Sequence, residues 1–162
     1  MPFDMVLYGI RRSDGLLKLG RSWVLERRLS QLRKQYGVPM EVEFTRQCPR
    51  DAVVEAEVTV HRLCAVQRRD GEWFDVDRET GLEAVEMTIR ALFDRSRHLA
   101  AAALCLRLEL DWSVEETAPR VGLIPSAIGG YEIPNFLFGA TEIYLRKLEK
   151  AGERWRRENR SS

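Results

Sequence analysis

Two apolar runs flank a polar turn in the segment Met5-Val-Leu-Tyr-Gly-Ile-Arg-Arg-Ser-Asp-Gly-Leu-Leu-Lys-Leu-Gly20. Each run has the composition of a β-strand, and the Asp-Gly pair between them favours a tight reversal of the chain. The segment therefore predicts a β-hairpin. If the strands pair about Ser13 and Asp14, Tyr8 lies nearly opposite Lys18, and the two side chains project from the same face of the sheet.

Helical and extended patterns alternate after this hairpin. Apolar residues recur at helical spacing in residues 24–36, 51–67 and 79–95. Met40–Thr45 alternates apolar with polar residues, as a strand with one buried face does. Glu72–Val76 is expected to be a short strand or an extended segment. We therefore predict an α+β fold in which helices flank a small three-stranded antiparallel sheet.

The last third of the chain has a different composition. An Ala-rich run begins near Arg97 and His98, and the patterns after it are helical. We predict one domain over residues 1–97 and an all-α domain over residues 98–162, joined by a linker or a continuous helix.

Overall composition excludes several classes of protein. The 162 residues are 44% hydrophobic and 31% charged, and 26 basic residues against 25 acidic ones give a net charge of +1. A uniformly basic nucleic-acid binder is thereby excluded, although the first 50 residues and the tail from Arg146 are each locally basic. Because apolar runs are short and no apolar signal core follows Met1, we expect a cytoplasmic protein without a membrane partner.

Helix geometry gathers further polar groups near the hairpin. On a wheel of about 100° per residue, Arg28 borders the apolar stripe of its helix, whereas Arg27 points nearly away from it. Glu57 lies beside the apolar stripe of the next helix, and His61 lies one turn further on. A phenol, a guanidinium, a carboxylate and an imidazole are therefore expected near one centre.

The order of these residues resembles the GIY-YIG nuclease superfamily, in the short branch found in phage and bacterial proteins. The resemblance spans about residues 5–76. It rests on five pieces in order: Val6-Leu-Tyr8, Lys18-Leu-Gly-Arg-Ser22, Arg27-Arg-Leu29, Glu57-Val-Thr-Val-His61 and Gly71-Glu-Trp-Phe74. Lys18 stands where much of the superfamily has the second motif tyrosine.

This resemblance implies a metal-dependent endonuclease that hydrolyses DNA. Tyr8 would activate or orient the attacking water, with Lys18 stabilising its deprotonated form, and Arg28 would hold the phosphoryl charge. Glu57 would anchor one Mg²⁺ or Mn²⁺, which suits a site with a single carboxylate because magnesium keeps several waters. His61 would position Glu57, accept a proton or contact phosphate.

The same residues also have ordinary structural interpretations. His61 can close a hydrogen bond in the core, and Tyr8 can simply pack on the sheet. Lys18 can be a solvated charge, and Arg28 and Glu57 can each form a surface ion pair, that of Glu57 with a neighbouring arginine. Trp73 and Phe74 are interpreted as core residues.

A second resemblance concerns the helical domain. Ser113-Val-Glu-Glu116 is a capping box, and Leu110–Glu132 resembles the helix-turn-helix of Xre/Cro-type repressors. A reading helix needs long polar side chains, but this one would present Ser126 and several still smaller residues. A module that packs, forms a homodimer through its helices or grips the DNA backbone is an equal alternative.

Predicted DNA contacts are Arg21 and Arg27 beside the motifs and Ser126 in the helical domain. The leading hypothesis is a nuclease whose second domain assists DNA binding or self-association. Two alternatives stay open: a noncatalytic DNA-binding regulator on a nuclease scaffold, and a phage-type protein-interaction factor.

Overall fold

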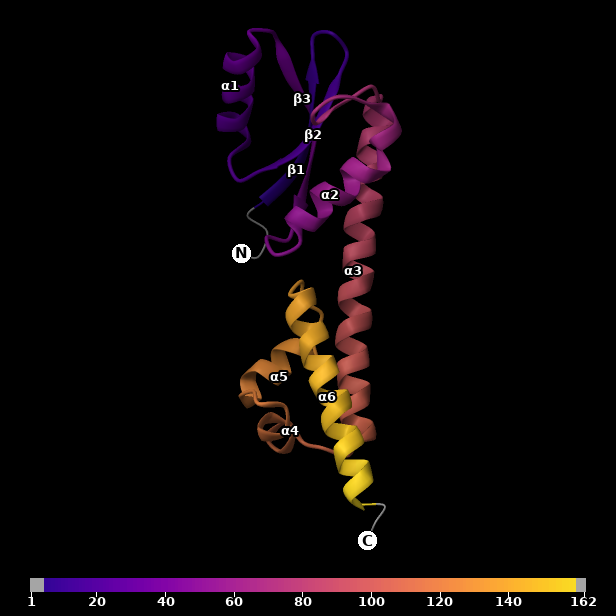
Figure 1. Ribbon diagram of the computed structural model, residues 1–162. Coiled ribbons are helices and arrows are strands. Elements are labelled where there is room, and N and C mark those ends of the chain that lie inside the picture. Colours follow the sequence, from indigo (N-terminus) through magenta and orange to yellow (C-terminus); the bar gives the residue numbers. More distant parts are fainter. Residues whose placement is uncertain (1–4, 160–162) are drawn as a thin grey trace. The chain divides into compact units, whose positions relative to one another are not determined.

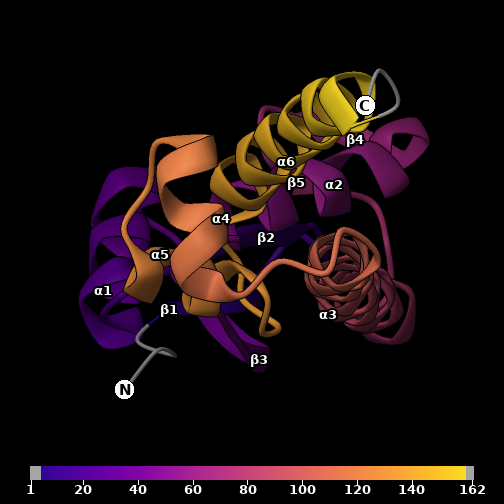
Figure 2. The same cartoon turned by 90° about the horizontal axis from the view of Figure 1, so that it is seen from below.

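Residues 5–159 are described by a computed structural model (Figure 1). The chain divides into two compact units, and the division falls between Leu92 and Phe93. This point lies inside helix α3 (Arg78–Glu109), which Figure 2 shows nearly end-on. The sequence placed the boundary at residue 97, where the composition changes. Helix α3 contributes residues to both units.

The first unit is built on an antiparallel sheet, which confirms the predicted α+β class. The sheet has five strands in the order β3-β1-β2-β5-β4, not the three that were expected. Strand β4 contains three residues, too few to show a periodic pattern. Strand β5 contains two residues and lies within Glu72–Val76, where a short strand or extended segment was expected. The strands are β1 (Met5–Arg12), β2 (Leu17–Ser22), β3 (Met40–Cys48), β4 (Arg68–Asp70) and β5 (Trp73–Phe74).

The hairpin of β1 and β2 forms in a different register from the one expected. Tyr8 pairs with Gly20, and Lys18 pairs with Ile10. The shift arises because the chain reverses through a longer loop, in which Gly15 adopts a left-handed conformation (φ 93°) and its N–H donates to the carbonyl of Arg12 at 2.9 Å. Tyr8 and Lys18 still share a face of the sheet, because the register differs by an even number of residues.

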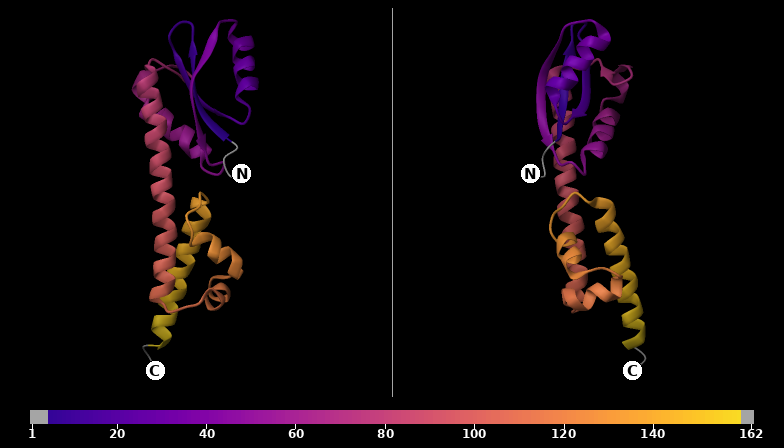
Figure 3. Two further views of the ribbon diagram at one scale, coloured as in Figure 1. Left: turned by 180° about the vertical axis from the view of Figure 1, so that it is seen from behind. Right: turned by 90° about the vertical axis from the view of Figure 1, so that its left-hand side faces the viewer.

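Helices cover both faces of this sheet (Figures 1 and 3). Helix α1 (Leu25–Tyr36) packs on the face that carries Tyr8 and Ile10, with Leu32 buried between them. Helix α2 (Val53–Leu63) and the first turns of α3 cover the opposite face. A short 3₁₀ turn, η1 (Ala65–Gln67), leads from α2 into β4. These elements confirm the helices that apolar spacing predicted.

One edge of β2 is only partly paired. Strand β5 pairs with β2 at Leu17 and Lys18 alone, so the remainder of β2 up to Ser22 has no strand partner on that side among the described residues. Backbone and side chains from both faces of the sheet can therefore meet at this edge. Ionisable side chains from β1, β2, α1 and α2 gather there.

The second unit is helical, as predicted. Its core is formed by residues of α3 and of the three helices that follow, with Leu110, Ile128 and Leu148 fully buried. Ser113 caps α4 through both bonds of the predicted capping box. The new helices are α4 (Val114–Val121), α5 (Pro125–Tyr131) and α6 (Phe138–Asn159).

Two glycines in the central strands make room for aromatic rings. A Cβ atom at Gly9 would lie 2.4 Å from the ring of Phe44, and one at Gly20 would lie 2.7 Å from the hydroxyl of Tyr8. Both separations are shorter than contact distance. Any side chain at these positions would displace the facing ring.

We therefore expect Gly9→Ala to lower the free energy of unfolding by about 1–3 kcal/mol, because the strand cannot move away from Phe44 without breaking its ladder. Gly129→Ala in α5 is the matched control. Its Cβ would meet nothing within 4 Å, and it should be neutral or stabilising. Urea denaturation of both variants measures the difference, and equal midpoints would contradict the packing argument.

Candidate functional site

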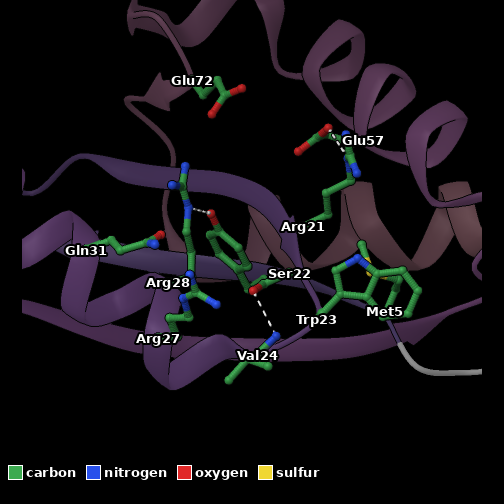
Figure 4. Close-up of a pocket in the computed structure, with 11 residues that line it drawn as sticks. Met5, Arg21, Ser22, Trp23, Val24, Arg27, Arg28, Gln31, Glu57 and Glu72 are labelled. Atoms are coloured by element: carbon green, nitrogen blue, oxygen red, sulfur yellow. Dashed lines mark hydrogen bonds and ion pairs between the residues drawn. The ribbon is translucent and has the colours of Figure 1, made fainter.

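A pocket of about 470 Å³ lies at the partly paired edge of β2 (Figure 4). Its polar lining comes from β1, β2, α1, α2 and the turn before β5. The ionisable side chains in it are Tyr8, Arg21, Arg27, Arg28, Glu57 and Glu72. Five segments far apart in the chain therefore supply one set of charged and phenolic groups.

Tyr8 and Arg28 form the centre of this set. Tyr8 is 1% exposed, and its side chain extends from β1 over Gly20, where no side chain blocks it. The Nε–H of Arg28 donates to the Tyr8 hydroxyl at 3.2 Å. Burial raises the pKa of Tyr8, and the hydrogen bond and charge of Arg28 offset this only in part. The phenol is therefore protonated at neutral pH, next to a permanently charged guanidinium.

Arg27 also lines the pocket, although the helical wheel pointed it away from the apolar stripe. The pocket lies beside the first turn of α1 and not beneath its stripe, so both arginines reach it. The hydrogen bond from Arg28 to Tyr8 raises the pKa of Arg28 further above that of a free arginine.

Glu57 reaches the pocket from α2 and is paired with an arginine of β2. The Nε–H of Arg21 donates to Oε2 of Glu57 at 2.7 Å, with the carboxylate side chain 17% exposed. An ion pair with a neighbouring arginine was the structural alternative to metal binding by Glu57, and this ion pair is present. The predicted metal ligand and a predicted DNA contact therefore hold one another.

Lys18 takes a different position from the expected one. Its side chain is 6% exposed and does not line the pocket; its ammonium donates to Glu72 at 2.5 Å and lies 5.5 Å from the centre of the Trp73 ring. Lys18 was expected to lie beside the hydroxyl of Tyr8, but it pairs with Glu72 instead. The reason is that Lys18 stands opposite Ile10 in the hairpin and not opposite Tyr8. Lys18 therefore adjoins the pocket through its ion pair with Glu72.

Glu72 is the ionisable residue of the pocket lining that the sequence did not predict. It follows Gly71, whose left-handed conformation turns β4 into β5 and directs the carboxylate to the pocket. Burial raises its pKa, but the hydrogen bond and charge of Lys18, with smaller effects of His61 and Arg28, lower it overall. The signal was present in the Gly71-Glu-Trp-Phe74 motif, where Glu72 was read only as part of a resemblance.

His61 and Ser126 stand apart from the pocket lining. The Nε2 atom of His61 lies 2.8 Å from the carbonyl oxygen of Leu19, which can only accept, so Nε2 carries the proton and donates. The imidazole thus satisfies a backbone carbonyl at the partly paired edge, as its structural interpretation held. Ser126 is exposed on α5 in the second unit.

The α+β unit holds a tyrosine, arginines and glutamates in one pocket, and the same unit matches a known protein family. The model of the T5orf172 domain matches residues 6–90, more than half of the chain, and the protein belongs to this family. The domain occurs in phage-type proteins associated with GIY-YIG and HNH-like nucleases, and it indicates a nuclease or DNA-binding role.

Other comparisons give no match. No GIY-YIG model and no helix-turn-helix model matches the chain directly. No curated protein and no solved structure matches. None of the helices within residues 5–159 is long and apolar enough to cross a membrane.

The Lys18–Glu72 pair leads to an asymmetric stability prediction. Glu72→Gln leaves a buried ammonium without its carboxylate and should cost about 1–3 kcal/mol, less than a fully buried pair because Glu72 is 44% exposed. Lys18→Met leaves a carboxylate that water can reach and should cost less than about 1 kcal/mol. Urea unfolding of both variants tests whether Glu72→Gln lowers the free energy of unfolding more than Lys18→Met does.

A pH series provides the control. The pair contributes stability above the ordinary pKa of a glutamate, and that contribution is lost as the pH falls through the lowered pKa of Glu72 in the folded state. The difference in the free energy of unfolding between wild type and Lys18→Met should therefore become smaller at acidic pH. A larger cost for Lys18→Met than for Glu72→Gln would show that Lys18 is held by packing alone.

Proposed function

We propose that this protein is a metal-dependent endonuclease that hydrolyses DNA phosphodiester bonds by GIY-YIG-type chemistry. The observation that carries the proposal is that Tyr8, Arg28 and Glu57 line one pocket although they come from three separate elements. Family membership supports the coarser nuclease or DNA-binding role. The pocket supplies the parts that phosphodiester hydrolysis needs: a group to orient water, a cation for the phosphoryl oxygens and a carboxylate.

The donor set fits a magnesium ion. Glu57 and Glu72 offer hard carboxylate oxygens in the same pocket, and no cluster of three His, Cys, Asp or Glu side chains able to hold a metal occurs among residues 5–159. Magnesium suits such a site because it takes few protein ligands and keeps water in its shell. Glu57 would hold the magnesium ion. When bound, the ion would polarise the phosphate and lower the pKa of a water molecule.

The protein's own groups would then act as follows. Tyr8 accepts a hydrogen bond from Arg28, so its own O–H proton remains to orient a water at the phenolic oxygen. Arg28 stays charged and uses its remaining N–H groups on the phosphoryl oxygens. Lys18 is a positioning residue that holds Glu72 at the pocket wall. Arg27, exposed on α1, would contact a neighbouring phosphate.

For the second unit we propose an accessory role in DNA binding or self-association. Its helices α4 and α5 are separated by Gly122, Leu123 and Ile124, and α5 presents Ser126 and two glycines to solvent. Side chains this short suit close approach to a backbone better than reading of base edges. A homodimer through the C-terminal helices is the other arrangement that we propose for this unit.

Plasmid cleavage with Mg²⁺ tests the nuclease directly. Glu57→Gln, Tyr8→Phe and Arg28→Lys should each reduce the rate by about 10²-fold or more. Glu55→Gln, on the same helix but exposed, is the matched control and should retain activity. Equal rates for Glu57→Gln and wild type would contradict catalysis, and salt-sensitive duplex binding without cleavage would favour a noncatalytic regulator.

Binding of Mn²⁺ tests the role of Glu57 separately. Because Arg21 holds Oε2 of Glu57, Arg21→Gln should raise the affinity for Mn²⁺ by about 1.5- to 5-fold, the worth of a partly exposed ion pair. Glu57→Gln should abolish this binding. Electron paramagnetic resonance of free Mn²⁺ measures the Mn²⁺ affinity of both variants, and this measurement does not depend on DNA cleavage. Unchanged binding in Glu57→Gln would place the cation elsewhere.

A further inference from the structure

The pocket has an apolar side that the proposed chemistry does not use. Trp23 and Val24 follow β2 directly, and Trp23 lines the pocket next to Met5, on the other side of the view from Arg27 and Arg28 (Figure 4). Their exposed fractions are 51% and 53%, which is unusual for two consecutive large apolar residues. Exposed aromatic area at the rim of a charged pocket is typical of a binding surface.

Trp23 is also held in place. The guanidinium of Arg50 lies 5.0 Å from the centre of the indole ring, at cation–π distance. The backbone N–H of Val24 donates to the hydroxyl of Ser22 at 3.2 Å, which orders the turn that carries the indole. Trp23 is therefore a fixed platform, which lowers the entropic cost of stacking a ligand on it.

The two sides of the pocket match the two parts of a nucleotide. The guanidinium groups of Arg27 and Arg28 suit a phosphate, and the indole suits the flat face of a base. The volume of about 470 Å³ is in the range of sites for small ligands. A phosphate alone would leave the indole uncovered.

We infer that Trp23 stacks on an unpaired base next to the phosphate held by Arg28, so that the site takes single-stranded or locally unpaired DNA. Inside an intact duplex, each base face is covered by its neighbours and is closed to an indole. A strand end, a flap, a bubble or a base turned out of the helix presents such a face. This inference rests on the proposed function, because it assumes that the arginines hold a DNA phosphate.

A double-mutant cycle tests the contact between Trp23 and a base. Fluorescence anisotropy in EDTA, which prevents hydrolysis, compares a thymidine oligonucleotide of about 12 residues with an abasic strand of the same length. Wild type should bind the thymidine strand about 5- to 150-fold more tightly than the abasic one. In Trp23→Ala this preference should disappear, while binding of the abasic strand stays unchanged.

Two variants control for structure. Trp23→Phe keeps a stacking face and should retain most of the preference, whereas Val66→Ala removes another exposed apolar side chain of the same unit and should change nothing. Circular dichroism confirms that Trp23→Ala is folded. An equal preference for bases in wild type and Trp23→Ala would overturn the inference.

Failure of this inference is distinguishable from failure of the proposed function. If the protein cleaves duplex plasmid with Mg²⁺ but Trp23→Ala binds both strands as wild type does, the nuclease stands and the stacking site falls. If no DNA is cleaved but the base preference depends on Trp23, the stacking site stands in a protein that only binds. Tighter binding of intact duplex than of single strands by wild type would also count against the inference.

Discussion

The candidate site depends on the short pairing between β5 and β2. Because β5 pairs only with Leu17 and Lys18, the far half of β2 presents an edge without a strand partner among the described residues. At this edge Tyr8 and Arg28 arrive from one face of the sheet, and Glu57 arrives from the other. If β5 continued along β2, it would occupy the place where these groups meet.

The charges in the pocket are arranged partly in pairs: Arg21 holds Glu57, and Lys18 holds Glu72. Burial raises the pKa of Glu72, but the hydrogen bond and charge of Lys18 lower it overall. The lining also contains Arg27 and Arg28, so positive charge is in excess. Such an arrangement favours an anionic ligand.

Local patterns in the sequence predicted the elements well, and long-range side-chain partners poorly. The spacing of apolar residues predicted the helices, and a pattern of four residues predicted the capping box at Ser113. The register of the first hairpin failed because one loop residue decides it. That error moved Lys18 from the phenol to Glu72, because a side chain's partner depends on which residue stands opposite.

Two further features lay outside the reach of sequence patterns. The pairing of Arg21 with Glu57 joins β2 to α2, and no periodicity encodes which of several arginines a carboxylate meets. Glu72 stands in a turn between two very short strands, where neither hydropathy nor spacing gives a signal. Motif resemblance compensated in part, because it kept Tyr8, Arg28 and Glu57 together without knowledge of their contacts.

A second buried tyrosine forms a hydrogen bond of the opposite direction to that of Tyr8. Tyr144 is as buried as Tyr8, and burial, followed by its bond to Glu132, raises its pKa. Its hydroxyl donates to Glu132 at 2.7 Å, and Arg107 holds the same carboxylate, so the proton of Tyr144 is already used inside the core. Tyr8 instead accepts from Arg28 and keeps its proton for a group in the pocket. The two tyrosines therefore differ in the direction of one hydrogen bond, and this difference is what the proposed role of Tyr8 in orienting a water requires.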